Sequence, residues 1–286
     1  SDLVVLEVDQ DAPEKVVWSS GAEYRITDLP AVGFSGDYYH RPAFIHGQWI
    51  EFQGCVMFID PSGKGLDETA YSIVAHLNGN LFVLEVGSFR EGYTEPVLRG
   101  IAEAAKRRKV KLILLEDQFG QGMMENLLQP YLREVYPCTI EATRSNVQKE
   151  RRIINALEPV MNQHRLIFNR SVIEDDSKAR DDDSVETALA YQLFHQLTHL
   201  TVDKQSLQHD DRLDSLAGAV QYWNESLAID EDRAIKEREQ ELWELELAAY
   251  KGDIEGLLDA QILGVPLTQV QNKNPKAGWI KTHGNH

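Results

Sequence analysis

This sequence has few cysteines, no long apolar run and no net positive charge. Its 286 residues include only two cysteines, Cys55 and Cys138. Both lie in apolar runs, which excludes a disulfide framework and a cysteine-rich zinc site. No apolar run approaches the roughly 20 residues that span a bilayer, and the polar N-terminus lacks the pattern of a signal peptide. We therefore expect a reduced, cytosolic globular protein with no membrane partner.

The net charge of −17 argues at first against a nucleic-acid partner, because phosphates attract basic surfaces. The acidic residues are concentrated, however, in the segments 174–186 and 231–260. Elsewhere the chain is locally basic, in KRRKVK (106–111) and RSNVQKERR (144–152). The net charge therefore does not exclude DNA.

A nucleotide-binding P-loop is also absent. The stretch SGKG (62–65) is similar to part of one, but a P-loop requires G-x-x-x-x-G-K followed by Ser or Thr at the start of a helix. Here Gly65 follows Lys64 and a strand-like run comes next. No other segment supplies the motif, so we expect no ATPase in this sequence.

Regular alternation of apolar runs begins at Cys55. Strands are predicted over 55–60, 70–77 and 81–86, and the NGN turn at 78–80 predicts that the last two form a hairpin. Strands and helices then alternate, in the order helix 95–108, strand 110–116, helix 122–134, strand 138–142 and helix 146–162. Because helical crossovers join parallel strands and hairpins join antiparallel ones, we expect an α/β fold with a mixed sheet flanked by helices.

The two ends of the chain have a different character. Residues 1–54 hold short β-like pieces broken by Pro and Gly, which indicates a linker or an edge extension of the sheet. The main domain is predicted over 55–230. It includes a short strand RLIF (165–168), an acidic loop over 169–183, and helices over 184–199 and 210–228. Residues 231–286 read as an acidic helical tail with a flexible end.

Several carboxylates occur where a metal site would need them. Asp60 and Glu116 each end a predicted buried strand, and open α/β sheets place their sites at the carboxyl ends of such strands. Asp210 and Asp211 begin an amphipathic helix, and Asp214 lies one turn beyond Asp211. Carboxylates brought this close repel one another unless a cation lies between them, and oxygen ligands suit Mg²⁺ or Mn²⁺. Two such ions would serve phosphodiester hydrolysis by stabilising its attacking and leaving oxygens.

Each acid alone also has a structural explanation. Asp60 precedes Pro-Ser-Gly, where Asp commonly forms a turn. Asp210 or Asp211 could cap the helix, and Glu116 could be a solvated strand end. A metal site is favoured because all of these acids fall at corresponding positions of one predicted order of strands and helices, β-β-β-α-β-α-β-α.

Four segments together resemble one protein family. They are FIDPSGKGLDETAY, LLEDQFGQGMMENLL, RSNVQKERRIINAL and HDDRLDSLAGAV. In this order they resemble the nuclease domain of the large terminase subunit of tailed bacteriophages, above all the short-tailed phages, over about residues 55–228. The resemblance implies an RNase H-like fold, with three antiparallel strands followed by two parallel ones. It also implies metal-dependent cleavage of concatemeric double-stranded DNA, and we expect weak sequence preference.

The resemblance carries over to particular residues. It implies that Asp60, Glu116 and an acid of the HDD motif hold two Mg²⁺ or Mn²⁺ ions. We expect Asp211 to be that acid, with Asp210 and Asp214 as alternatives. Contacts to the DNA backbone are expected from basic residues in two segments, with a solvated helix face as the alternative: Lys106, Arg107, Arg108, Arg144, Lys149, Arg151 and Arg152.

The resemblance also implies partners and a place in the cell. A large terminase subunit carries a packaging ATPase domain, so residues 1–54 would include the linker from that domain. Its other partners would be the portal protein and the small terminase subunit, in the cytoplasm of the infected bacterial host. Two alternatives remain open. One is another DNA enzyme of the same fold, such as a junction resolvase or a transposase. The other is a non-enzymatic module that grips DNA and docks on the portal.

Overall fold

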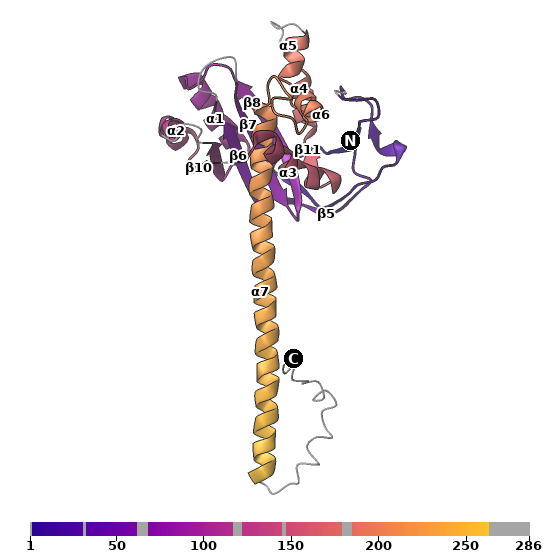
Figure 1. The fold of residues 1–286 in the computed structure, drawn as a ribbon, viewed down its shortest axis with the longest axis vertical. Coiled ribbons are helices and arrows are strands. Elements are labelled where there is room, and N and C mark those ends of the chain that lie inside the picture. The colour runs from indigo at the N-terminus through magenta and orange to yellow at the C-terminus, as the bar shows by residue number, and fades with distance from the viewer. Residues whose placement is uncertain are drawn as a thin grey trace. The chain divides into compact units, whose positions relative to one another are not determined.

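A computed structural model shows the fold (Figure 1) and describes residues 2–30, 33–61, 68–116, 122–144, 147–178 and 185–262. The chain divides into two compact units, residues 1–227 and 228–286, and each is described by itself. Within the described part of the chain, no helix combines the length and the apolar character that crossing a bilayer requires.

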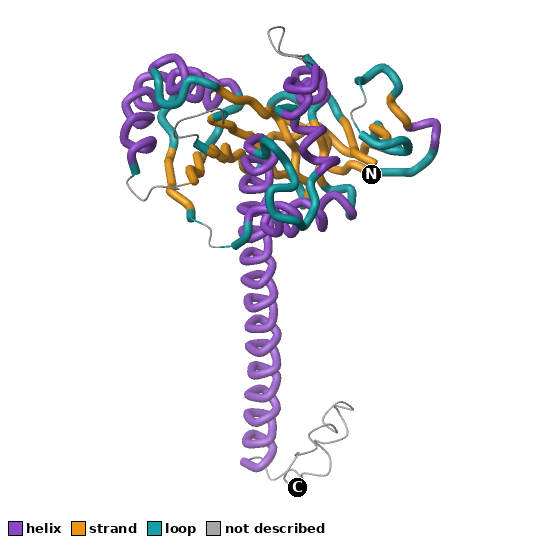
Figure 2. The backbone as a smooth tube through the Cα atoms, turned by 45° about the horizontal axis from the view of Figure 1, so that its top comes forward, coloured by secondary structure: helices purple, strands orange, loops and turns teal. Residues whose placement is uncertain are grey.

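A nine-stranded sheet forms the centre of the first unit (Figure 2), and its strand order is β10-β9-β6-β7-β8-β11-β1-β4-β3. Its strands are β1 (Asp2–Val5), β3 (Arg25–Ile26), β4 (Tyr38–His40), β6 (Gly54–Asp60), β7 (Thr69–Leu77), β8 (Asn80–Phe89), β9 (Leu112–Glu116), β10 (Thr139–Thr143) and β11 (Leu166–Phe168). A separate antiparallel pair consists of β2 (Asp11–Val17) and β5 (Phe44–Glu51).

The part of the sheet from β8 to β10 confirms the predicted mixed topology. Strands β6, β7 and β8 are antiparallel neighbours, whereas β9 runs parallel to β6 and β10 parallel to β9. The hairpin between β7 and β8 turns at Asn78 and Gly79, whose φ angles of 49° and 81° match the turn that an Asn-Gly pair favours. Three antiparallel strands followed by two parallel ones form the RNase H-like arrangement.

Strand β11 and three strands from the first 54 residues extend this sheet beyond β8. Strand β11 pairs in parallel with β8 and with β1, and β1 pairs in parallel with β4. The short strand β3 completes the edge as the antiparallel neighbour of β4, directly after a 3-10 turn at Ala22–Tyr24. The predicted domain limits at residues 54 and 230 remain predictions.

Helices cover both faces of the sheet. On β6, Met57 and Ile59 point to the face covered by α1 (Glu95–Arg107) and α2 (Met123–Val135). Phe58 points to the opposite face. That face is covered by α3 (Lys149–Asn162), α4 (Arg170–Ser177), α6 (Leu193–His199) and the first turns of α7 (Asp211–Ile262). Alternate residues of one buried strand therefore enter two separate apolar cores.

The prediction of an acidic loop over 169–183 is wrong for its first half. Arg170–Ser177 forms α4, because Val172 and Ile173 are buried in the core and anchor this acid-rich segment as a helix. Residues 179–184 lie outside the described part of the chain. The single helix predicted over 184–199 is divided into α5 (Val185–Ala190) and α6.

In the second unit, the later part of α7 continues as helix to Ile262. Over residues 228–244 of this unit, where burial is described, large apolar side chains are exposed at Ile229, Ile235, Leu242 and Trp243.

Candidate metal centre

Three carboxylates meet at one edge of the sheet. Asp60 ends β6 and Glu116 ends β9, and these strands are parallel neighbours in which Ile59 pairs with Leu115. The first turn of α7 adds Asp214. Each of the three acids offers one carboxylate oxygen, and all these atoms lie within 4.8 Å of one another. The parallel pairing of β6 and β9 thus brings Asp60 and Glu116 together, as the sequence predicted.

Helix α7 is fixed against the sheet so that Asp214 reaches this edge. The hydroxyls of Ser215 and Ser72 on β7 form a buried hydrogen bond of 2.7 Å. Further along the helix, the Nε1 of Trp223 donates to the carbonyl of Val74 at 3.0 Å. Between them lies Gly218, where a Cβ atom would approach the ring of Phe58 to 2.5 Å. The absence of a side chain at Gly218 therefore allows α7 to pack closely on β6.

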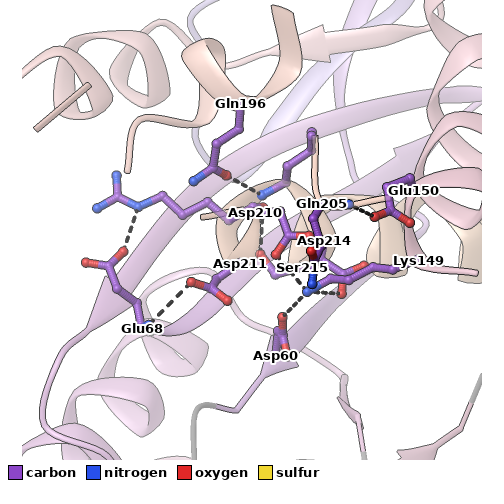
Figure 3. Close-up of polar contacts among 12 residues, drawn as sticks. Asp60, Glu68, Lys149, Glu150, Gln196, Gln205, Asp210, Asp211, Asp214 and Ser215 are labelled. Carbon is purple, nitrogen blue, oxygen red and sulfur yellow. Dashed lines mark hydrogen bonds and ion pairs between the residues drawn. The ribbon is translucent and has the colours of Figure 1, made fainter. Parts of the chain in front are cut away.

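Two basic residues from the start of α3 reach into the carboxylate group. The Nζ of Lys149 lies 2.8 Å from Asp210, 3.1 Å from Asp214 and 3.6 Å from Asp60 (Figure 3). The guanidinium of Arg152 donates to Glu116 at 2.8 Å and to both carboxylate oxygens of Asp214, at 2.7 and 2.8 Å. Two cations thus face four carboxylates, and the formal charge of the group is negative.

Burial makes this surplus of negative charge costly. Asp60 is 3% exposed and Asp214 is 1% exposed. Burial is the main reason that the pKa of each of these carboxyl groups is raised above its ordinary value. Neighbouring carboxylates raise the pKa further, whereas the positive charge of Lys149 lowers it. The pKa of Lys149 is raised: burial lowers it, but the carboxylates of Asp214, Asp60 and Asp210 outweigh burial. A buried group of carboxylate oxygens whose charge is only partly balanced fits Mg²⁺ or Mn²⁺.

The acids at the start of α7 point in different directions. Asp214 joins the strand-end acids and Asp210 contacts Lys149. The carboxylate of Asp211, which we expected to be the helix ligand, accepts the backbone N–H of Glu68 at 3.4 Å (Figure 3). Among the described residues, the close carboxylate group comprises Asp60, Glu116 and Asp214 and does not include Asp211. The geometry thus favours Asp214, which was an alternative, and metal binding by any of these acids remains a prediction.

Comparison with known proteins agrees with the fold. Residues 59–166 match the family model described as the ribonuclease H-like domain of the bacteriophage T7 terminase. The sequence is 34% identical over 230 residues to the large terminase subunit of Enterobacteria phage T3. This chain carries a terminase ribonuclease H-like domain of the phage T7 type. The match covers 80% of the chain and 39% of the length of the T3 protein.

Solved structures of terminase nuclease domains have lower sequence identity to this chain. One is a variant of the nuclease domain of the large terminase subunit of bacterial virus Sf6, with manganese. It is 12% identical with a TM-score of 0.44, and the match covers 60% of this chain and 90% of that one. Another is the human cytomegalovirus terminase nuclease domain, at 11% identity and a TM-score of 0.42. That match covers 59% of this chain and 82% of that one.

Beside the carboxylates, this terminase domain contains a buried ionic network that the sequence analysis missed. Arg212, between Asp211 and Asp214 on α7, places its guanidinium 3.3 Å from Glu68, 3.2 Å from Asp176 on α4 and 3.0 Å from the hydroxyl of Ser88 on β8. Arg212 thus links the start of α7 to α4, to β8 and to Glu68, which directly precedes β7. In the sequence it lies among acids and reads as a surface ion-pair residue, so no local signal reveals its role.

The carboxylate of Asp176 also fixes the start of α6. It accepts the backbone N–H groups of Leu193 at 2.8 Å and Phe194 at 3.1 Å. The first N–H groups of a helix lack partners within the helix, so this contact determines where α6 begins. Since Arg212 binds the same carboxylate, α6 and α7 are fixed through one buried acid.

The basic residues expected to contact DNA have different surroundings in the structure. Lys149 and Arg152 point to the carboxylates, as described. Arg107 and Arg108, at the end of α1, both contact Glu85. The side chains at three further positions are exposed, and these are Lys106, Arg144 and Arg151. DNA contact by any of these residues remains a prediction.

Proposed function

We propose that this chain cuts double-stranded DNA as the metal-dependent endonuclease domain of a phage DNA-packaging motor. The observation that carries the proposal is the group of carboxylate oxygens from Asp60, Glu116 and Asp214, within 4.8 Å of one another at the end of two parallel strands. The terminase relationship of residues 59–166 supports DNA as the substrate.

The donor atoms suit two Mg²⁺ or Mn²⁺ ions held by Asp60, Glu116 and Asp214, with Asp210 beside them. Bound divalent ions would lower the pKa of water and stabilise the charge on the leaving oxygen. Arg152 orients Glu116 and Asp214 through hydrogen bonds to both, and Lys149 holds Asp210 next to them. The side chains of Lys149 and Arg152 therefore keep mutually repelling acids in one arrangement.

Exposed basic side chains supply contacts to the DNA backbone in this proposal. Arg144 follows β10 directly, and Arg151 lies on α3 next to Arg152. Lys106 lies in the last turn of α1. Contacts of this kind bind phosphates and carry no sequence information, so weak sequence preference follows. The packaging ATPase domain, the portal protein and the small terminase subunit, in the cytoplasm of the infected bacterium, complete the proposal.

Cleavage of supercoiled plasmid by the wild type and by Asp60→Asn tests this function. We expect the wild type to nick and linearise the plasmid with Mn²⁺ or Mg²⁺ and not with EDTA. Since loss of a group that only supports a metal ligand typically costs 10–100-fold in activity, Asp60→Asn should lower the rate by at least about 100-fold.

The matched control is Asp175→Asn. Asp175 is an exposed acid on α4 that pairs with Lys178, and its removal should leave the rate unchanged. Undiminished cutting by Asp60→Asn would overturn the site. A folded wild-type protein that binds DNA and does not cut it with any metal would overturn the proposed endonuclease activity.

A further inference from the structure

A cavity of about 200 Å³ lies next to the carboxylate centre, and it is built by the same elements. Its floor includes Phe58 and Leu114, which precede Asp60 and Glu116 by two residues and therefore point to the same face of the sheet. Gly218 lines it one helical turn after Asp214. The cavity thus lies one layer of side chains away from the proposed metal ligands.

The rim of the cavity is polar and carries little net charge. Arg152 forms part of the wall, but its guanidinium is bound by Glu116 and Asp214. Arg144 and Glu225 bring opposite charges to the rim. The remaining groups come from Thr143, Gln221 and Tyr222, and the amide of Gln221 donates to the carboxylate of Glu225 at 2.8 Å.

The apolar floor and the polar rim indicate which part of a DNA strand the cavity can hold. A phosphate is a charged group, and an apolar floor of Phe58, Leu114 and Gly218 would bury it at high cost. A nucleobase is flat and uncharged, and proteins hold unstacked bases by aromatic contact and by hydrogen bonds to the base edge. Tyr222 offers the ring, and Gln221 and Glu225 offer edge contacts, with the carboxylate suited to accept from an exocyclic amino group. The volume is below the roughly 300–1,000 Å³ of sites for drug-sized ligands, which suits a single base.

We propose that this cavity takes one nucleobase of the bound DNA, close to the position of cutting. The inference rests on the proposed function for its substrate. Entry requires the base to leave its stack, which is easiest in single-stranded or distorted DNA. Cutting should therefore show a preference at a single nucleotide position, of roughly fivefold, as one hydrogen bond to a base edge supplies.

Photo-crosslinking tests occupancy of the cavity without any cutting. The probe is an oligonucleotide duplex with a single-stranded overhang in which 5-iodocytosine, which keeps the exocyclic amino group, replaces cytosine, and it is irradiated with the protein in EDTA. We expect the crosslinked peptide to contain Tyr222 and the yield at that peptide to fall in Tyr222→Leu. DNA that binds the wild type and crosslinks only to residues outside the cavity would overturn the proposal.

Mapping of nick positions in plasmid DNA with Mn²⁺ tests the effect on cutting. Gln221→Ala and Glu225→Gln should reduce the single-position preference of the wild type. The control is Glu231→Gln, an exposed acid on α7 in the second unit, which should leave the preference and the rate unchanged.

The outcomes separate this inference from the endonuclease itself. A lower cutting rate in Gln221→Ala with an unchanged nucleotide preference would indicate that the cavity binds a phosphate. It would overturn the proposal that the cavity binds a nucleobase. A crosslink at Tyr222 in a protein that cuts no DNA would refute the endonuclease and support the cavity. Cutting without a crosslink in the cavity, and with the same nucleotide preference in every variant, would refute nucleobase binding in the cavity and leave the endonuclease proposal intact.

Discussion

Two ionic clusters in the first unit, the carboxylate centre and the group around Glu85, differ in their balance of charge. In the carboxylate centre, Lys149 and Arg152 face four acids, and burial and neighbouring carboxylates raise the pKa of Asp60 and Asp214. In the second cluster, Arg107 and Arg108 share the single carboxylate of Glu85.

The pKa of Glu85 moves in the other direction. Burial acts to raise it, but hydrogen bonds from Arg107, Arg108 and Tyr71 outweigh burial and lower it. A cluster whose acid is fully matched by cations can serve packing alone. A cluster with surplus acid is held together at a cost in stability, which a bound cation would offset. Three predictions test this difference.

The largest effect on stability is expected from Arg152→Met. The side chain of Arg152 is 9% exposed, and its loss removes the cation that contacts Glu116 and leaves Asp214 with Lys149 alone. Breaking a buried ion pair typically costs about 3–5 kcal/mol. Urea denaturation in EDTA should show a loss of that size, and Mn²⁺ should restore part of it.

The control for this variant is Arg107→Met in the other cluster. Arg107 is 53% exposed, and Glu85 retains Arg108 when it is removed. We expect a loss below about 1 kcal/mol that Mn²⁺ does not change. Equal losses in the two variants would show that the clusters do not differ.

The next effect is stabilisation by metal. A ligand that binds only the folded state, at 100 times its dissociation constant, adds about 2.7 kcal/mol to stability. Thermal denaturation with and without Mn²⁺ should show a rise in the melting temperature of the wild type and of Glu85→Gln, and little or none in Asp60→Asn. An equal rise in all three proteins would exclude Asp60 as a ligand.

The smallest effect concerns the pH dependence of the Glu85 cluster. Because the folded state lowers the pKa of Glu85, its stabilisation is fully present above the ordinary value of about 4.3. It is lost as the pH falls through the lower folded value. Glu85→Gln should therefore be less stable than the wild type by about 1–3 kcal/mol at pH 7, and this gap should close towards pH 3. Urea denaturation of both proteins across this range measures the gap, and a gap independent of pH would contradict the prediction.

Much of the fold was predictable because its signals are local. Asp60 and Glu116 end short apolar runs bounded by turn residues, and the Asn-Gly pair at 78–79 determines a hairpin without help from distant residues. The place of β1 in the sheet had no such signal, because Val4 pairs with Ile167 from a distant part of the chain. Helix α4 was missed because burial of Val172 and Ile173 depends on tertiary packing that an acid-rich sequence does not reveal.

The choice between Asp211 and Asp214 was beyond the sequence for a different reason. Residues 213–220 of α7 are buried on every side, so the helix has no solvated face there from which the inward direction could be inferred. The contact between Glu68 and Asp211 and the three partners of Arg212 determine how the first turn is oriented, and all of these partners are distant in the sequence.

The position of β1 between β4 and β11 has a consequence for synthesis of the protein. β1 is translated near the beginning of this sequence, whereas β11 follows three helices later. At about 5–20 residues per second, a ribosome takes of the order of ten seconds or longer to make the chain between them. During that time β1 has no β11 to pair with, and β8 has an open edge. Completion of the sheet therefore waits for Leu166–Phe168, and a nascent chain that stops before β11 would expose two strand edges to aggregation.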